Sequence, residues 1–345
     1  MNEKCLDEDR VGPVSTSRSM ALASPQAIAA ATPHLLGFQP HESLVCLWLQ
    51  DGQLLVIQRA DLPPSTDEAS DRCTDFDDYV DAYMSTAATL RADEVVILCQ
   101  TRHKDIGVAV VQRSIAQARV PVRAGLVASG SRVCDVKQGD EWLWISTQDR
   151  QEATRRFAHV HSPGSLRRSR ADVVQEVEFD PAHAWPIPED PDPDLDVGCL
   201  AGVLTAGDWH SVAADRALRD GALFTRGRDL VMWWAASLEP QARGGLLGAL
   251  LRGLRATPEG HASQLACAAA TVAWLCGDGV RANAALERCL KEDPRNVMGQ
   301  MLEAALGSAL PPSEFASMLG DVEPASVGLA PGSHHPRGRF HDRRL

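Results

Sequence analysis

Long apolar runs alternate with amphipathic stretches in the first half of the chain, and each pattern predicts its own kind of element. Nearly continuous apolar runs, typical of strands buried on both faces, cover residues 43–49 and 94–100, and two further strands are predicted over 54–60 and 120–129. Apolar residues with helical spacing cover 75–90 and 105–118. Two shorter runs, 132–136 and 141–146, predict a closing hairpin. Strands that alternate with helices predict an α/β domain with a mixed sheet and flanking helices.

Turn-forming residues mark the borders of the first elements. Ser24 and Pro25 suit the first positions of a helix, and we expect that helix to end at Pro33. Asp51-Gly52 separates the first two apolar runs. Both residues tolerate a positive φ, so this pair predicts a two-residue type I′ hairpin.

The second half of the chain has a different pattern. Prolines and acidic residues crowd into 178–196, where they oppose regular structure and extend the chain. Residues 197–319 have helical periodicity throughout. The predicted organisation is therefore a disordered segment over 1–20, an α/β domain over 21–177 and an acidic proline-rich linker over 178–196. An all-α helical domain over 197–319 and a disordered tail over 320–345 follow.

One helix pair in the helical part is similar to a tetratricopeptide repeat. Gly277, Ala282 and Pro294 have the spacing at which that repeat turns, brings its helices together and ends. The preceding helix departs from the repeat, because small residues stand where the repeat has large ones: Ala266, Ala269, Ala270 and Ala273. Two interpretations stay open, a simple antiparallel hairpin in a helical domain and a superhelical groove that binds a peptide.

Composition excludes several classes of function. The net charge of −12 argues against binding to nucleic acid. No apolar run approaches the roughly 20 residues that a membrane helix needs, and residues 1–10 lack the apolar core of a signal peptide, so we expect a cytoplasmic protein. The nine cysteines include no Cys-x-x-Cys pair, and no phosphate-binding glycine motif is present. We therefore predict no metal and no cofactor.

Four polar residues beside the first two predicted strands are candidates for a ligand or partner site. His41 and Glu42 precede the first strand, and Arg59 and Asp61 end the second. Arg59 and Asp61 could form only a local ion pair at a sheet edge, or they could line a site at the strand ends, where α/β sheets usually bind ligands. A catalytic triad of neighbouring residues is disfavoured, because successive strand residues point to opposite faces.

Trp142 and Trp144 form a second candidate. They alternate along a predicted strand and therefore share one face of the sheet. They could be aromatic residues that cover the sheet, or they could form a platform for a ligand or partner, because aromatic rings supply a large contact area.

The segment around the first hairpin resembles a known family. Leu35-Leu36-Gly37-Phe38 with Ser43-Leu44-Val45, followed by Arg59-x-Asp61-Leu62-Pro63, is similar to the N-terminal signature of the actinobacterial domain of unknown function DUF4192. The tryptophan strand, Ser169-Arg170, and the helix pair from Gly277 to Pro294 extend the resemblance over most of 24–319.

Two departures limit what the resemblance implies. The family commonly has Asp-Gly-Arg-Trp-Trp where this chain has Gly139-Asp140-Glu141-Trp142-Leu143-Trp144. A cysteine pair that often follows in the family has no counterpart between residues 146 and 162, so no metal or redox role carries over. The resemblance thus implies an architecture and no reaction.

Two functional hypotheses follow. The first is a non-enzymatic binding or scaffold protein, in which residues 197–319 bind another protein. The alternative is an enzyme of unrecognised type, with a polar site at the strand ends formed by Arg59, Asp61 and the loop around Gly37. A closed pocket around Arg59 and Asp61 would favour the enzyme, whereas mutual pairing of these two residues would disfavour it.

Overall fold

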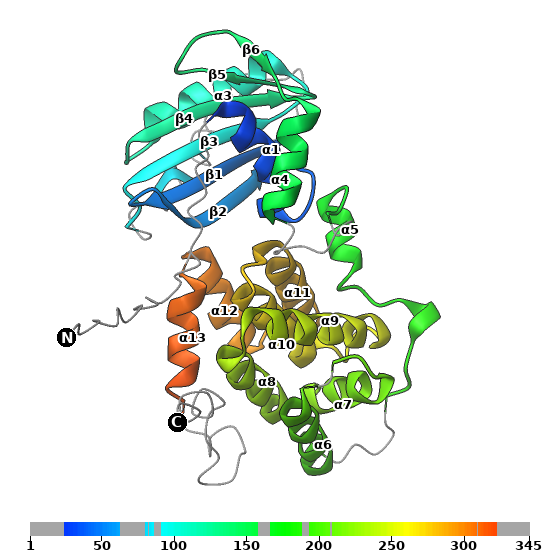
Figure 1. The fold of residues 1–345 in the computed structure, drawn as a ribbon. Helices are drawn as coiled ribbons and strands as arrows, with labels where there is room; N and C mark the ends of the chain where they lie inside the picture. Colours follow the sequence, from blue (N-terminus) through cyan, green and yellow to red (C-terminus); the bar gives the residue numbers. More distant parts are fainter. Residues whose placement is uncertain are drawn as a thin grey trace, which may run out of the picture.

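The computed structural model describes two halves, a sheet and a bundle of helices, which are joined beside α5 (Figure 1). We use "sheet half" for residues 24–157, "connecting segment" for 166–187 and "helical half" for 193–322. The described residues are 24–62, 80–81, 83–85, 91–157, 166–187, 193–207, 209–308 and 310–322. The predictions of disorder for 1–20 and for most of 320–345 lie outside these residues.

The sheet half contains one six-stranded mixed sheet, which confirms the predicted fold class. Its strands are β1 (Ser43–Gln50), β2 (Gln53–Asp61), β3 (Glu94–Gln100), β4 (Val122–Ser129), β5 (Arg132–Asp135) and β6 (Trp142–Trp144). Their order is β2-β1-β3-β4-β5-β6, and only β3 and β4 run parallel. The helix α3 (Lys104–Gln117) makes the crossover between these two parallel strands.

The apolar runs of β1 and β3 became buried strands because both faces of the sheet are covered there, whereas the edge strand β2 is only half-buried. On one face, α1 (Pro25–Leu36) and α4 (Thr147–Phe157) pack over a buried cluster that includes Val45 and Leu47. On the other face, α3 packs over a cluster that includes Leu44, Cys46 and Trp48. The hairpin between β1 and β2 turns at Asp51-Gly52, with φ of 51° and 73°, as the two-residue loop predicts.

The prediction that Pro33 ends the first helix was wrong. Pro33 lies inside α1, which continues to Leu36 and ends at Gly37 with φ of 78°. Proline removes one backbone donor, but the buried apolar face of α1 continues past it to Leu36. Packing on the sheet therefore outweighs the missing hydrogen bond.

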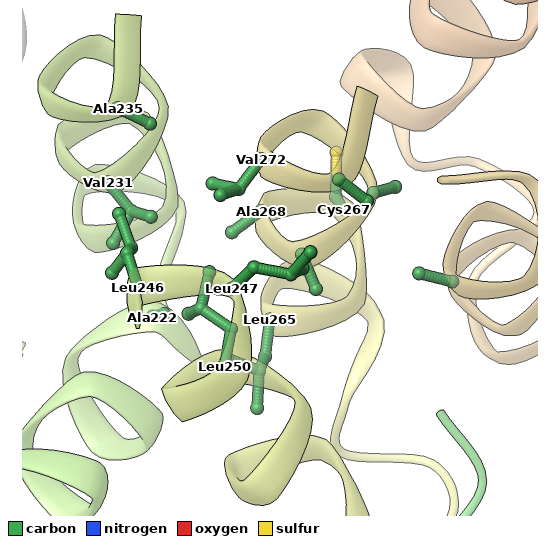
Figure 2. Close-up of a cluster of buried hydrophobic side chains, with 14 of the residues drawn as sticks. Ala222, Val231, Ala235, Leu246, Leu247, Leu250, Leu265, Cys267, Ala268 and Val272 are labelled. Atoms are coloured by element: carbon green, nitrogen blue, oxygen red, sulfur yellow. The ribbon is translucent and has the colours of Figure 1, made fainter. Parts of the chain in front are cut away.

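The helical half is a bundle of helices with the buried helix α10 at its centre. They are α6 (Pro193–Ala206), α7 (Val212–Ala222), α8 (Thr225–Ser237), α9 (Pro240–Ala256), α10 (Ser263–Leu275), α11 (Gly279–Glu292), α12 (Val297–Gly307) and α13 (Pro312–Gly320). Figure 2 shows side chains of α7, α8 and α9 gathered around α10. Every residue of α10 from Leu265 onward is buried, and α10 contacts six other helices. Its alanines are explained by this position, because small side chains let several helices approach one helix closely.

The turn between α10 and α11 uses the predicted glycine. Gly277 has φ of 78°, its N–H donates to the Trp274 carbonyl at 2.8 Å, and the Asp278 N–H donates to the Ala273 carbonyl at 2.9 Å. These two bonds form a Schellman motif, which satisfies the last carbonyls of α10. The antiparallel hairpin is therefore real, while its similarity to a tetratricopeptide repeat stays a prediction.

The connecting segment is tied to the helical half. It contains α5 (Arg170–Gln175) and a short 3₁₀ turn, η1 (Pro181–His183). The Asp180 N–H donates to the Arg255 carbonyl at 2.8 Å, and the Trp185 N–H donates to the Ala256 carbonyl at 2.9 Å. Helix α6 begins at Pro193, inside the stretch that was expected to be a linker. Regular structure therefore enters the acidic proline-rich stretch, where the sequence disfavoured it.

Candidate functional site

The four polar residues predicted beside the first two strands lie at the same end of the sheet, where β1 starts and β2 ends. Ser43 at the start of β1 pairs with Asp61 at the end of β2 and with Gln100 at the end of β3. The backbone N–H of Leu62 donates to the Glu42 carbonyl at 2.8 Å. The start of β1 and the ends of β2 and β3 therefore bring Glu42 and Asp61 together, with the loop after β3 beside them.

Glu42 connects β1 to the loop after β3. Its carboxylate accepts hydrogen bonds from the Thr101 hydroxyl at 2.6 Å and from the Arg102 backbone N–H at 3.0 Å. Burial raises the pKa of the Glu42 carboxyl, but these two bonds and the nearby charges outweigh burial, so the pKa lies below its ordinary value. Sequence reasoning missed Thr101 and Arg102, although a polar run directly after a buried strand was a visible signal.

Arg59 and Asp61 pair with each other. The Arg59 guanidinium contacts the Asp61 carboxylate, and its Nε donates to the Ser43 hydroxyl at 3.0 Å. That hydroxyl in turn donates to the backbone carbonyl of His41 at 2.6 Å. The Arg59 side chain is largely buried and lies over the ring of Phe38, while Asp61 is 71% exposed. These contacts join β1, β2 and the turn before them.

The two tryptophans do not join this group. They lie on β6, and β6 and β2 are the opposite edge strands of the sheet. Trp142 is half-buried against the core under α3, and the Lys104 ammonium lies 4.7 Å from the centre of its indole. Trp144 is 62% exposed, and the Arg132 guanidinium lies 5.9 Å from its ring centre. The six predicted residues thus form two separate groups, and their role as binding sites stays a prediction.

A cavity that sequence reasoning missed lies in the helical half. Its volume is about 350 Å³, and it opens between α6, α7, α10 and α11 beside the end of the connecting segment. Apolar side chains form part of its wall: Ile187, Leu223 and Phe224. Its polar lining consists of four carboxylates, an imidazole, a hydroxyl and an amide: Asp196, Asp220, Glu292, Asp293, His261, Ser263 and Gln264. The residues come from segments far apart in the chain, so no local motif announces them.

The carboxylates of this cavity differ in how they are balanced. Glu292 accepts hydrogen bonds from the Arg288 Nε at 2.9 Å and from the Ala262 N–H at 2.6 Å, so its charge is used inside the protein. Asp220 Oδ1 lies 2.5 Å from Arg219 Nε, yet neither atom makes a hydrogen bond. Burial raises the pKa of Asp220 above its ordinary value although Arg219 opposes the shift. A cationic group in the cavity would offset this cost of keeping Asp220 charged.

Neither metal-binding clusters nor membrane spans are found in the part of the chain that the structure describes. No three side chains among His, Cys, Asp and Glu are arranged there to hold a metal ion. The helices in the same residues are too short or too polar to cross a bilayer.

Comparison with known proteins identifies the family. The protein-family model described as "Domain of unknown function (DUF4192)" matches the chain twice, over residues 25–182 and 145–313. No curated protein and no solved structure matches the chain. The two matches overlap in and around α5 and together cover the sheet half and most of the helical half. Because they account for well over half of its residues, the chain belongs to the DUF4192 family.

Proposed function

We propose that this protein is a cytoplasmic, non-enzymatic binding protein whose helical half binds a partner protein. The observation that carries the proposal is the cavity between α6, α7, α10 and α11. A concave site with apolar walls and a few polar groups is the usual form of a binding site. Its carboxylates favour a positively charged side chain of the partner, lysine or arginine, as the group that enters.

The contacts at the strand ends weigh against the alternative of an enzyme there. Arg59 pairs with Asp61 and Ser43, and Glu42 is bonded to Thr101 and to the backbone of Arg102. Arg59 and Glu42 are thus engaged in joining neighbouring strands and loops. A catalytic base or nucleophile instead needs to reach a substrate.

The proposal is tested by affinity capture with the full-length chain as bait. His261→Arg places a guanidinium among the carboxylates of the cavity, and His261 is exposed, so the fold should tolerate it. We expect His261→Arg to recover at least about tenfold less of the proteins that the wild type captures. The matched control is His41→Arg, an exposed histidine of the sheet half.

Two results would contradict this proposal. Capture of the same proteins by the wild type and by His261→Arg would show that the cavity does not bind them. Loss of capture with His41→Arg, but not with His261→Arg, would move the site to the strand ends. Thermal unfolding of each variant checks that the fold is unchanged.

A further inference from the structure

Strand β6 has an open outer edge. It is the last strand of the sheet, and within the described residues no strand pairs with its outer side. The Ile145 N–H donates to the Ser131 carbonyl at 2.8 Å. Backbone groups alternate in an antiparallel ladder, so Leu143 and Ile145 face β5, while the N–H and C=O groups of Trp142 and Trp144 face outward.

The side chains beside this edge form one mixed surface of aromatic rings and cations. Trp142 and Trp144 stand on the same face of β6. Lys104 lies against the first ring and Arg132 against the second, so each indole has a cation beside it. An exposed tryptophan at a strand edge is unusual, because native proteins normally protect such edges with charges or cover them.

We propose that the β6 edge docks an extended, acidic segment of a partner protein as an added strand. The outward N–H and C=O groups of Trp142 and Trp144 would pair with the backbone of this segment. Its side chains on the tryptophan face would lie across from the two indoles. Its carboxylates would lie beside Lys104 and Arg132, because these are the cations next to the rings.

Charge selects this occupant over a second copy of the chain. In a symmetric antiparallel pairing of two β6 strands, Trp142 of one copy would lie opposite Trp144 of the other. Lys104 would then approach Arg132 of the second copy, and like charges across strands are destabilising.

Charge and geometry also favour a peptide over a nucleic acid. The whole chain carries −12, which repels phosphate backbones, and the outward backbone groups match a strand. Asp140 and Glu141 precede β6, so the acidic residues of the partner are expected nearer Arg132 than beyond Trp142.

A displayed library of random heptapeptides, selected on the full-length chain, tests the proposal. We expect enrichment of peptides that carry Asp or Glu two positions from a β-branched or aromatic residue, because both side chains must lie on the tryptophan face beside Lys104 and Arg132. Synthetic versions of these peptides should bind Trp144→Ala and Arg132→Glu at least about tenfold more weakly than the wild type. Arg155→Glu, a charge reversal on the exposed face of α4, is the matched control and should bind like the wild type.

Further measurements keep the outcome decisive. Backbone amide exchange of Trp142 and Trp144 should slow when the peptide is bound, which binding to side chains alone would not cause. Failure to enrich acidic peptides, or equal binding to Trp144→Ala and the wild type, would overturn the proposal. So would a wild-type dimer that Trp144→Ala dissociates, or binding of oligo-deoxythymidine that depends on Trp144. Unchanged thermal unfolding of Trp144→Ala, expected because its ring is largely exposed, confirms that the variant is folded.

Discussion

Glu42 is the residue at which local strain and tertiary contacts meet. Its φ of 38° lies in the left-handed region, which costs a residue with a side chain about 1 kcal/mol. The cost is offset by the bonds that its carboxylate accepts from Thr101 and Arg102. A glutamate therefore stands where the backbone alone favours glycine, because its side chain holds the loop after β3 against the start of β1.

The charge of Glu42 should make stability depend on pH. Its pKa in the folded protein lies below the ordinary 4.5, so the ionised carboxylate stabilises the fold above about pH 4.5, and this contribution is lost as the pH falls through the folded pKa. Glu42→Gln should lower the free energy of unfolding by about 0.5–1 kcal/mol at pH 7, a modest value because the side chain is 36% exposed.

Urea unfolding at pH 7, 5 and 4 measures this difference, which should shrink at the lowest pH. Arg102→Ala is the control, because it keeps the backbone N–H that donates to the Glu42 carboxylate. It removes only an exposed side chain, whose Nε lies 3.7 Å from Glu42 Oε1. A difference between Glu42→Gln and the wild type that is the same at every pH would contradict the assignment.

At the scale of elements, the α10–α11 hairpin shows how one backbone conformation sets a helix border. Gly277 ends α10 with a positive φ, and Asp278 begins α11 by accepting the Arg281 N–H at 3.0 Å. Both residues lie between two helices that pack directly against each other. So short a turn requires one residue in the left-handed region, and glycine adopts that conformation most readily.

Gly277→Ala and Gly279→Ala form a matched pair of tests. A methyl group would meet no atom within 4 Å at either position, so the two differ in backbone conformation and not in space. Gly277→Ala should destabilise the protein by about 1 kcal/mol, because alanine must adopt a positive φ. Gly279→Ala lies in the first turn of α11 and should be neutral or stabilising by up to about 1 kcal/mol. Denaturant unfolding distinguishes them, and equal effects would refute the explanation by φ.

At the scale of the whole molecule, α5 belongs to both halves. Val173 packs in the core of the sheet half, while Val177, just after α5, packs in the core of the helical half. Val280 of α11 reaches back toward the sheet core. Next to these apolar contacts, the largely buried Glu176 pairs with Arg167 and with Arg281, whose Nε lies 2.6 Å from it. The halves are therefore joined by packing and by charge, beyond the single chain connection.

Removing the charge of Glu176 should loosen this junction. Glu176→Gln leaves the guanidinium of Arg281 with Asp278 alone, and we expect a loss of about 1–3 kcal/mol. Calorimetry should show one unfolding transition for the wild type and a separation into two for Glu176→Gln. Glu287→Gln is the control. It removes the charge of an exposed residue that pairs with Arg170, and it should change stability by less than about 0.5 kcal/mol. One unchanged transition in Glu176→Gln would show that packing alone joins the halves.

The chain by itself determined the features that depend on neighbours in sequence. Apolar runs identified the strands, Asp51-Gly52 and Gly277 identified turns, and periodicity identified the helical half, because the pleat, the helix and the sign of φ are local properties. Tertiary structure alone decided that α1 passes through Pro33, since burial of its apolar face outweighs one missing hydrogen bond.

Tertiary structure also decided where sites can exist. The four polar residues at the strand ends were predicted together, but only the pairing of β1 with β3 brought Thr101 and Arg102 to Glu42. The free edge of β6 follows from the order of strands, and the cavity is lined by residues between Ile187 and Asp293. Such groupings depend on contacts between distant segments, which no local pattern encodes.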